Sequence, residues 1–209
     1  MWIDIQQNEE AWFDLRLGKV TGSAISKVMA NFGKAFGQPA KDLAVNLAIE
    51  QITEVRQGSD YSNAHMERGH IEEPFARRAY EEQYFIDVTN GGFYDNGATG
   101  CSPDGHAVEG LIEIKSAIAS IHYERIRKDT FDSGHKWQLI FNMKESKKPW
   151  IDFVSYCSAF PEQTRLFVKR LERDDFKQEY KMINDRLGEF FELVETVKKK
   201  VGGLTWETT

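Results

Sequence analysis

Residues 102–115 read SPDGHAVEGLIEIK, and this stretch decides what the rest of the chain has to support. Its first four residues predict a tight turn, because a proline and a glycine flank an aspartate. Its last five predict a buried strand, with Glu113 and Lys115 on one face and two isoleucines on the other. The turn can bring Asp104 beside Glu113, so two carboxylates and an amine would share one end of the strand.

Burying Glu113 and Lys115 in an apolar strand is unfavourable unless they find a strong partner. Two adjacent carboxylates repel, and a hard divalent cation with oxygen ligands relieves that repulsion. A lysine beside such a cation can hold or polarise a water nucleophile. An acid, a gap and then acid-x-lysine on a strand is therefore typical of metal-dependent enzymes that cut phosphodiesters. The residues alone leave open a second interpretation, a structural ion-pair cluster.

The composition is that of a folded protein without membrane segments. With 209 residues, of which 41% are hydrophobic, the chain is long enough for one domain over residues 1–209. No apolar run approaches the ~20 residues of a membrane span, and the first residues lack the pattern of a signal peptide. Cys101 and Cys157 form no CxxC pair. We therefore expect a cytoplasmic protein in a reducing compartment.

The net charge of −6 limits how the chain could bind nucleic acid. Phosphate contacts require lysine and arginine, so an acidic balance argues against broad coating of DNA. It remains compatible with a local basic groove.

Polar donors gather near the N-terminus. Residues 8–17 predict a short helix, and a second helix is predicted to begin with Thr21 as its cap and to run to about residue 29. The free N–H groups of such a helix start are a natural seat for a phosphate. Four donor side chains surround this position: Arg16, Lys19, Thr21 and Ser23. A helix pair with a polar cap is the alternative.

The remaining pattern alternates between helices and strands. Strands are predicted within 85–101, at 150–158 and at 163–171, and helices at 40–56, 63–84, 119–129, 135–143 and 174–200. Pro74 predicts a kink or a fresh start inside the second of these helices. This order predicts an α/β fold, a central mixed β-sheet flanked by helices, with the active site at one sheet edge.

Five blocks occur in order along the chain: Leu15–Ser23, Gly69 with Glu73, Cys101–Gly105, Glu113–Lys115 and Gln138. Between residues 12 and about 145, their order and spacing resemble those of the phage lambda-type alkaline exonucleases. That family groups with the YqaJ-like viral recombinases, within the PD-(D/E)xK superfamily. The resemblance implies a restriction-endonuclease-like core. One departure is Gly22, where such relatives often have alanine.

The resemblance also implies a reaction. Enzymes of this kind degrade one strand of linear double-stranded DNA from its 5′ end with Mg²⁺ or Mn²⁺, and leave a 3′ single-stranded overhang for recombination by strand annealing. It implies that Asp104 and Glu113 are metal ligands, with the backbone carbonyl of Ile114 as a third, and that Lys115 orients and activates the attacking water.

Further site residues follow from the same resemblance. Glu73 would support the metal waters, and Gln138 would position the nucleophile. The Glu72–Glu73 doublet leaves open which carboxylate faces the metal, although counting from Gly69 favours Glu73.

The resemblance also assigns residues to the DNA end. Arg16 and Ser23 match a 5′-phosphate pocket, to which Ser102 could add a donor. Trp12 and Met66 are candidates for apolar wedges that split a duplex end, with a core role as the alternative for both.

The expected partners are linear double-stranded DNA, a single-strand annealing protein and two further copies of this chain in a homotrimeric ring, in a phage or prophage context. Two rival functions remain at this stage. An endonuclease of the same superfamily would cut closed circular DNA, which an exonuclease leaves intact. A non-catalytic DNA-end-binding recombination protein would keep its function without Lys115.

Overall fold

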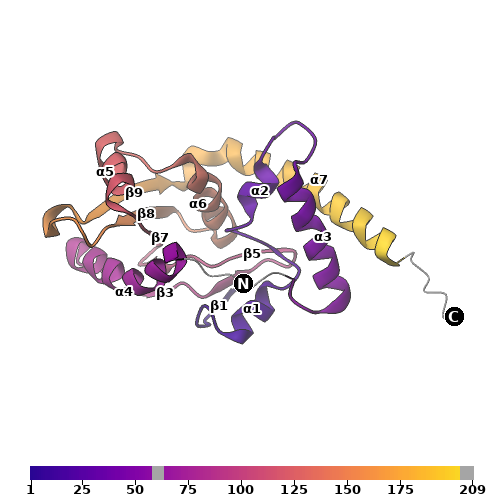
Figure 1. The fold of residues 1–209 in the computed structure, drawn as a ribbon, viewed down its shortest axis with the longest axis horizontal. Coiled ribbons are helices and arrows are strands. Elements are labelled where there is room, and N and C mark those ends of the chain that lie inside the picture. Colours follow the sequence, from indigo (N-terminus) through magenta and orange to yellow (C-terminus); the bar gives the residue numbers. More distant parts are fainter. Residues whose placement is uncertain (58–63, 203–209) are drawn as a thin grey trace.

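The computed structural model describes residues 1–57 and 64–202, and shows two mixed β-sheets with helices packed around them (Figure 1). The strands are β1 Trp2–Ile3, β2 Val20–Thr21, β3 Val88–Asn90, β4 Phe93–Asp95, β5 Thr99–Cys101, β6 Gly105–Ala107, β7 Gly110–Ser116, β8 Trp150–Tyr156 and β9 Leu166–Glu172. The helices are α1 Glu10–Arg16, α2 Ile25–Met29, α3 Gln38–Thr53, α4 Ala64–Tyr84, α5 Ala119–Lys128, α6 Ser133–Ser146 and α7 Lys177–Gly202, with 3₁₀ turns at Glu162–Thr164 and Arg173–Phe176. The predicted α/β class is confirmed.

The larger sheet has five strands in the order β3-β6-β7-β8-β9, with β7 in the middle. β7 runs parallel to β8, with Glu113 opposite Phe153, and the other pairs are antiparallel. Both faces of β7 are buried, because Ile112 and Ile114 pack with residues of α4 while Leu111 packs with residues of α6. A strand covered on both faces reads as a nearly continuous apolar run, as β7 does.

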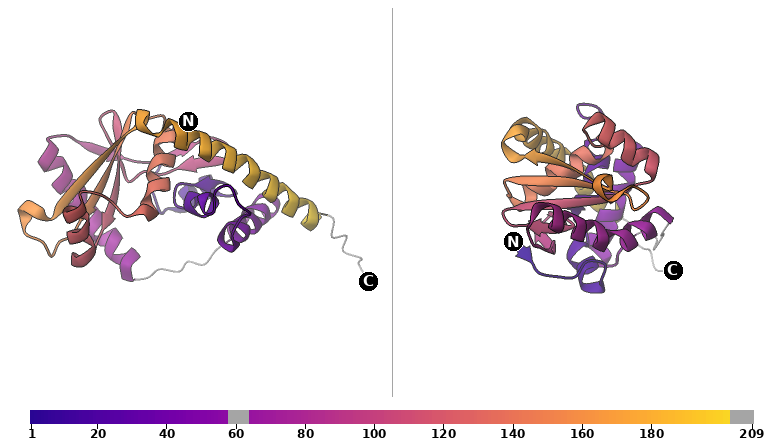
Figure 2. Two further views of the ribbon diagram at one scale, coloured as in Figure 1. Left: turned by 90° about the horizontal axis from the view of Figure 1, so that it is seen from above. Right: turned by 90° about the vertical axis from the view of Figure 1, so that its left-hand side faces the viewer.

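Helices close the larger sheet from both sides, as the end-on view in Figure 2 shows. On one face, Ala76 and Tyr80 of α4 are fully buried in the cluster that contains Ile112. On the other face, Leu139 of α6 joins the cluster of Leu111. Glu113 and Lys115 therefore point to the side of α6, and α4 approaches from the opposite side.

The smaller sheet differs from the sequence expectation of one central sheet. Its four strands have the order β1-β4-β5-β2, and β2 pairs in parallel with β5 so that Thr21 lies opposite Gly100. Because β5 leads directly into residues 102–105, this pairing brings the segment after Thr21 beside the Ser-Pro-Asp-Gly turn. Segments that lie 80 residues apart in the sequence meet there.

The predicted helix cap at Thr21 is wrong. Thr21 lies in β2, its carbonyl accepts a hydrogen bond from the Ala24 N–H at 2.9 Å, and α2 begins only at Ile25. The reason is that the β-branched Val20 and Thr21 pair with β5 instead of starting a helix. The helix start that was predicted at Thr21 therefore lies at Ile25, four residues later in the chain.

Three other elements are placed more sharply than the sequence allowed. α4 continues through Pro74 without a fresh start, so Glu73 lies in mid-helix. Residues 162–164 form a 3₁₀ turn, and strand β9 begins only at Leu166. The long C-terminal helix α7 packs along α3, with Phe190 fully buried (Figures 1 and 2). Among the described helices, none combines the length and apolar character that crossing a membrane requires.

Gly91 supports the Ser-Pro-Asp-Gly turn by close backbone approach, which generates a first prediction. A Cβ atom at Gly91 would lie 1.8 Å from the Pro103 carbonyl oxygen. We expect Gly91→Ala to lower the free energy of unfolding by about 1–3 kcal/mol, because backbone atoms have to move apart. The control is Gly188→Ala in α7, where a Cβ meets nothing within 4 Å and where alanine, the better helix former, should keep or raise the stability. Urea denaturation in which Gly91→Ala matches the parent would contradict this account of Gly91.

Candidate active site

Glu113 is the centre of a hydrogen-bonded cluster between β7 and α6. Its side chain is 1% exposed. Oε1 accepts hydrogen bonds from Lys115 Nζ at 2.6 Å and Gln138 Nε2 at 2.5 Å, and Oε2 accepts one from Asn142 Nδ2 at 2.9 Å. Three donors thus fix both oxygens of one buried carboxylate. The structure brings the predicted residues Glu113, Lys115 and Gln138 together.

The electrostatics of this cluster tie Asp104 to the same site. Burial raises the pKa of Glu113 to about 7, the negative charge of Asp104 adds to the rise, and Lys115 opposes it. Burial pushes the pKa of Lys115 down, but the charges of Glu113 and Asp104 outweigh it and raise that pKa above its usual range. Lys115 is therefore an ammonium group, facing a carboxylate that two effects make reluctant to ionise.

Asp104 directly precedes strand β6, at the end of the β6–β7 pairing. Its Oδ2 accepts a hydrogen bond of 2.6 Å from the Ile114 N–H. The β6–β7 pairing ends at Gly105 opposite Ile112, so Ile114 lies just beyond it. Because the N–H and C=O of one strand residue point to the same edge, the Ile114 carbonyl faces the edge that Asp104 occupies.

Helix α4 brings a second acid to this edge. Arg77 donates to the Asp104 carbonyl and, at 3.3 Å, to Glu73 Oε1. Burial raises the pKa of Glu73, the Asp104 charge raises it further, and Arg77 opposes both. Glu72 instead accepts a hydrogen bond from Ser158 Oγ at 2.5 Å. Glu73 therefore faces Asp104, and Glu72 faces away.

A pocket of about 220 Å³ opens beside Asp104. Glu73 and Arg77 line it from α4, and residues 6–8 and Asn90 line it from the other side. The acid pair is thus reached from a concave surface.

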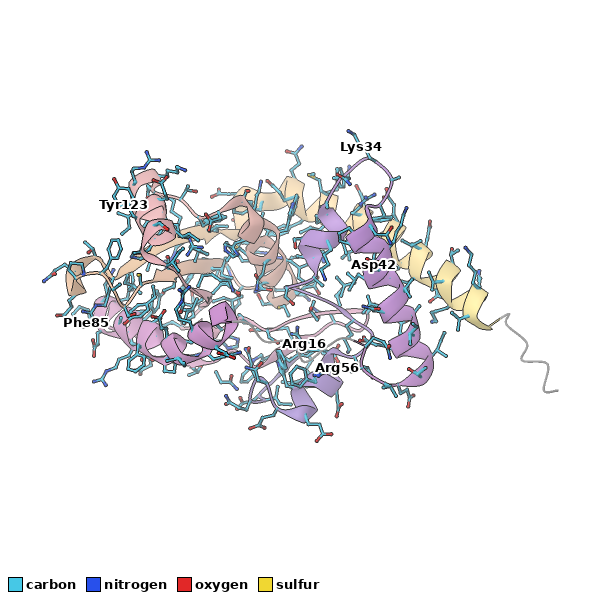
Figure 3. All side chains as sticks on the ribbon, viewed as in Figure 1. Arg16, Lys34, Asp42, Arg56, Phe85 and Tyr123 are labelled. Carbon is cyan, nitrogen blue, oxygen red and sulfur yellow. The ribbon has the colours of Figure 1, made fainter. Side chains whose placement is uncertain are left out.

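Arg16, the last residue of α1 and labelled in Figure 3, forms a second cluster beside the Ser-Pro-Asp-Gly turn. Its guanidinium lies 3.4 Å from Ser102 Oγ, 3.4 Å from Thr21 Oγ1 and 3.5 Å from Ser23 Oγ. It also stacks over the Trp12 ring, 4.0 Å from the centroid. The structure therefore brings together the predicted residues Arg16, Ser23 and Ser102.

The charge of Arg16 is uncompensated within the described chain. Burial lowers the pKa of its guanidinium to about 10, so it is still charged at neutral pH. Over residues 1–57 and 64–202, no carboxylate forms an ion pair with it, and its partners are hydroxyl groups. A half-buried cation surrounded by hydroxyl donors is suited to bind an anion such as a phosphate. We call Arg16, Thr21, Ser23 and Ser102 the anion seat.

The structure bears differently on three other residues that the sequence analysis assigned to phosphate or DNA-end binding. Lys19 was expected among the donors, but it pairs with Asp95 at 2.6 Å and so is not part of the anion seat. Trp12 is only 7% exposed and donates to Ser102 Oγ at 2.9 Å. The burial of the Trp12 indole favours the core role that the sequence left open as the alternative to a wedge. The side chain of Met66 lies outside the described residues.

The sequence analysis missed Asn142 and Arg77. Asn142 lies four residues after Gln138 on α6, and Arg77 lies four residues after Glu73 on α4. Residues four apart share one helix face, so each predicted site residue pointed to a neighbour one turn on. Without the packing of α4 and α6, nothing in the sequence tells which face points to the site.

The donor set fits a hard divalent cation. Among the described side chains, no group of three from His, Cys, Asp and Glu could enclose a metal ion. The available set is instead the carboxylates of Asp104 and Glu113 with the Ile114 carbonyl, which are oxygen donors of the kind that Mg²⁺ and Mn²⁺ prefer. Burial is the main reason that the pKa of Glu113 is raised to about 7, and the Asp104 charge adds a repulsion that a cation would relieve.

The comparisons with known proteins agree with this site. Residues 11–147 match the model of the YqaJ-like viral recombinase domain. The chain belongs to the YqaJ-like viral recombinase family. The matched range contains the anion seat and the Asp104–Glu113–Lys115 cluster, together with Glu73 and Gln138. A search of curated proteins found no match.

Solved structures extend the likeness over almost the whole chain. The alkaline exonuclease LHK-Exo from Laribacter hongkongensis is 31% identical, with a TM-score of 0.79 over 94% of this chain and 100% of that one. Its complex with dAMP gives 32% identity and the same TM-score. A phage-related exonuclease from Haemophilus somnus 129PT shares the fold at 14% identity, with a TM-score of 0.68 over 88% of this chain and 96% of that one. This viral recombinase family member is therefore a nuclease that acts on DNA.

The proximity of the two acids can be tested without a metal. We expect Asp104→Asn to lower the pKa of Glu113 from about 7 while leaving it above its ordinary value, because burial, the larger cause, persists. Carboxyl NMR titration of the metal-free protein measures this pKa. Glu72→Gln is the control, since Glu72 faces Ser158. If the pKa of Glu113 is the same in Asp104→Asn and in the parent protein, the two carboxylates do not interact and the described proximity is wrong.

Proposed function

We propose that this chain is a metal-dependent 5′-to-3′ exonuclease, which digests one strand of linear double-stranded DNA and leaves a 3′ overhang for strand annealing. The observation that carries the proposal is the buried Glu113, held by Lys115 and Gln138 beside Asp104 where the β6–β7 pairing ends. The alkaline exonuclease LHK-Exo, similar over its whole length, supports the choice of an exonuclease.

The chain's own residues would share the work. Asp104, Glu113 and the Ile114 carbonyl would hold Mg²⁺, or Mn²⁺ in its place. The bound cation would supply Lewis-acid stabilisation of the transferring phosphoryl group. Lys115, kept protonated by its acidic neighbours, would donate to the attacking water or to the charge that develops on the phosphate. Gln138 would position the nucleophile, and Glu73 would hold waters on the pocket side.

The anion seat would fix the 5′ end of the strand to be cut. Arg16 carries an uncompensated charge, and Ser102 lies only two residues before Asp104 in the chain. A 5′-phosphate bound there would set the distance of the first phosphodiester from the acid pair, which is catalysis by positioning. The complex of LHK-Exo with dAMP supports a site for a nucleotide in that relative.

Two partners remain proposals that rest on the family resemblance. We propose a homotrimeric ring that encircles DNA, and a single-strand annealing protein that takes over the overhang. A ring would let basic groups line a channel while the acidic balance of −6 faces outward.

The catalytic assignment predicts loss of activity without loss of fold. Asp104→Ala and Lys115→Ala should each slow Mg²⁺-dependent digestion of linear duplex by about 10²- to 10⁴-fold, because each removes a group that acts on the reacting phosphate. Glu72→Gln is the matched control and should digest like the parent. End-labelled linear duplex, with EDTA as the metal-free arm, measures rate and direction. Substantial digestion by either alanine variant would overturn the assignment.

The same assay separates the rival functions. Closed circular duplex should stay intact with the parent protein, whereas a superfamily endonuclease would cut it. A non-catalytic end-binding protein would leave linear DNA intact as well.

Arg16→Ala tests the anion seat. It should reduce the preference for 5′-phosphorylated over 5′-hydroxyl ends by about 10- to 100-fold, since a hydrogen bond between charged groups contributes about 1.5–3 kcal/mol. Initial rates on the two duplexes measure the preference. Lys27→Ala is the control, because Lys27 lies on the exposed side of α2. A parent protein that digests both ends equally fast would remove the seat from the proposal.

A further inference from the structure

The side chain of Asn142 lies between the catalytic carboxylate and the anion seat. It projects from α6, is 1% exposed, and its Nδ2 donates to Glu113 Oε2 at 2.9 Å. On the main-chain side, the Asn142 carbonyl accepts a hydrogen bond from Cys101 Sγ at 3.7 Å, at the end of β5. Asn142 therefore touches both the acid on β7 and the strand that leads into the Ser-Pro-Asp-Gly turn.

The other amide atom of Asn142 is the unusual one. Oδ1 is buried and has no hydrogen-bond partner among the described residues. An orphaned buried acceptor is unfavourable by about 1–3 kcal/mol, and native structures keep few of them. Such an atom calls for an explanation beyond packing.

Gly22 provides the contact that Oδ1 has. A Cβ atom built on Gly22 would lie 2.3 Å from Asn142 Oδ1, so only the hydrogen of a glycine Cα fits against this oxygen. A Cα–H pointing at a carbonyl oxygen is a weak attraction. A methyl group here, as in the alanine that such relatives often carry, would require the end of the Asn142 side chain to move, so in this chain the Gly22 backbone sets the position of the amide.

Gly22 lies between two residues of the anion seat. The hydroxyl groups of its neighbours Thr21 and Ser23 both accept hydrogen bonds from the Arg16 guanidinium, and their oxygens are 3.3 Å apart. The turn is closed by the Ala24 N–H donating to the Thr21 carbonyl at 2.9 Å. A continuous chain of contacts therefore runs from the seat through Gly22 and Asn142 to Glu113.

We propose that Asn142 is a positioning residue for Glu113. We propose also that Gly22 fixes the position of the Asn142 amide, so that the anion seat and the catalytic carboxylate are structurally coupled. Asn142 fixes Oε2 while Lys115 and Gln138 fix Oε1, which sets the plane of the carboxylate. The metal-facing part of this inference rests on the proposed function. The contact between Gly22 and Asn142 does not.

The first test measures cation binding. Mn²⁺ titrated calorimetrically into full-length protein should bind about 10- to 100-fold more weakly to Asn142→Ala than to the parent, as for other groups that orient a metal ligand. Asn142→Leu keeps nearly the same volume without the amide, and should lose as much affinity while remaining folded. Met143→Leu, a buried change on the same helix, is the control and should bind as the parent does. Parent-like Mn²⁺ affinity in folded Asn142→Leu would overturn the positioning role.

The second test is a double-mutant cycle. Gly22→Ala should weaken Mn²⁺ binding because the new methyl group displaces the amide, whereas Gly188→Ala should not. In Gly22→Ala/Asn142→Ala the clash is gone, so the double variant should match Asn142→Ala alone. Losses that multiply would show that Gly22 acts independently of Asn142, and would overturn the link to the seat.

If the parent protein binds no Mn²⁺ and digests no DNA, that result counts against the proposed function and not against the Gly22–Asn142 contact. The contact can still be tested with the parent, Gly22→Ala, Asn142→Ala and the double variant. Thermal unfolding midpoints of the metal-free proteins should then show the same non-additivity. Additive midpoint changes would overturn the Gly22–Asn142 contact itself.

Discussion

The structure depends on burying one carboxylate in the middle of a sheet. Glu113 is 1% exposed in a strand whose neighbours are apolar, and such a group is strongly unfavourable unless donors surround it. Two donors come from α6 and one from Lys115, two residues along the same strand. The packing of α6 on this face is therefore inseparable from the site, because the helix supplies two of the three donors that hold the buried acid.

The charges around Glu113 do not balance, because the carboxylates of Glu113 and Asp104 face one ammonium group, that of Lys115. Burial, and then the negative charge of Asp104, raise the pKa of Glu113 to about 7 against the opposing effect of the Lys115 ammonium group. A purely structural cluster of these residues, the alternative that the sequence left open, would have no need of a second acid that opposes ionisation of the first. Strongly shifted acids next to a pocket are a feature of functional sites.

How much the sequence could predict depends on the range of the interactions. The Ser-Pro-Asp-Gly turn and the alternation of β7 are local, so Asp104, Glu113 and Lys115 could be placed from periodicity. The parallel pairing of Thr21 with Gly100 is not local, and no pattern near either residue announces it. For that reason the predicted cap at Thr21 failed, although the residues it gathered, Arg16 and Ser23, do meet. Asn142 escaped notice because its role depends on how α6 is oriented.

The net negative charge of the chain limits how it can bind DNA. With a net charge of −6, contacts spread along a duplex would be weak and quickly screened, so affinity has to be concentrated at a few points. The anion seat offers a half-buried cation with no carboxylate partner in the described chain, and the acid pair invites a cation that would itself attract phosphate. In the proposed function both features would act on one short segment of DNA. A chain that is repelled along a duplex but holds a terminal phosphate in the anion seat would act at strand ends, because a 5′-phosphate group exists only there, and this argues for the proposed exonuclease over an enzyme that cuts within the strand.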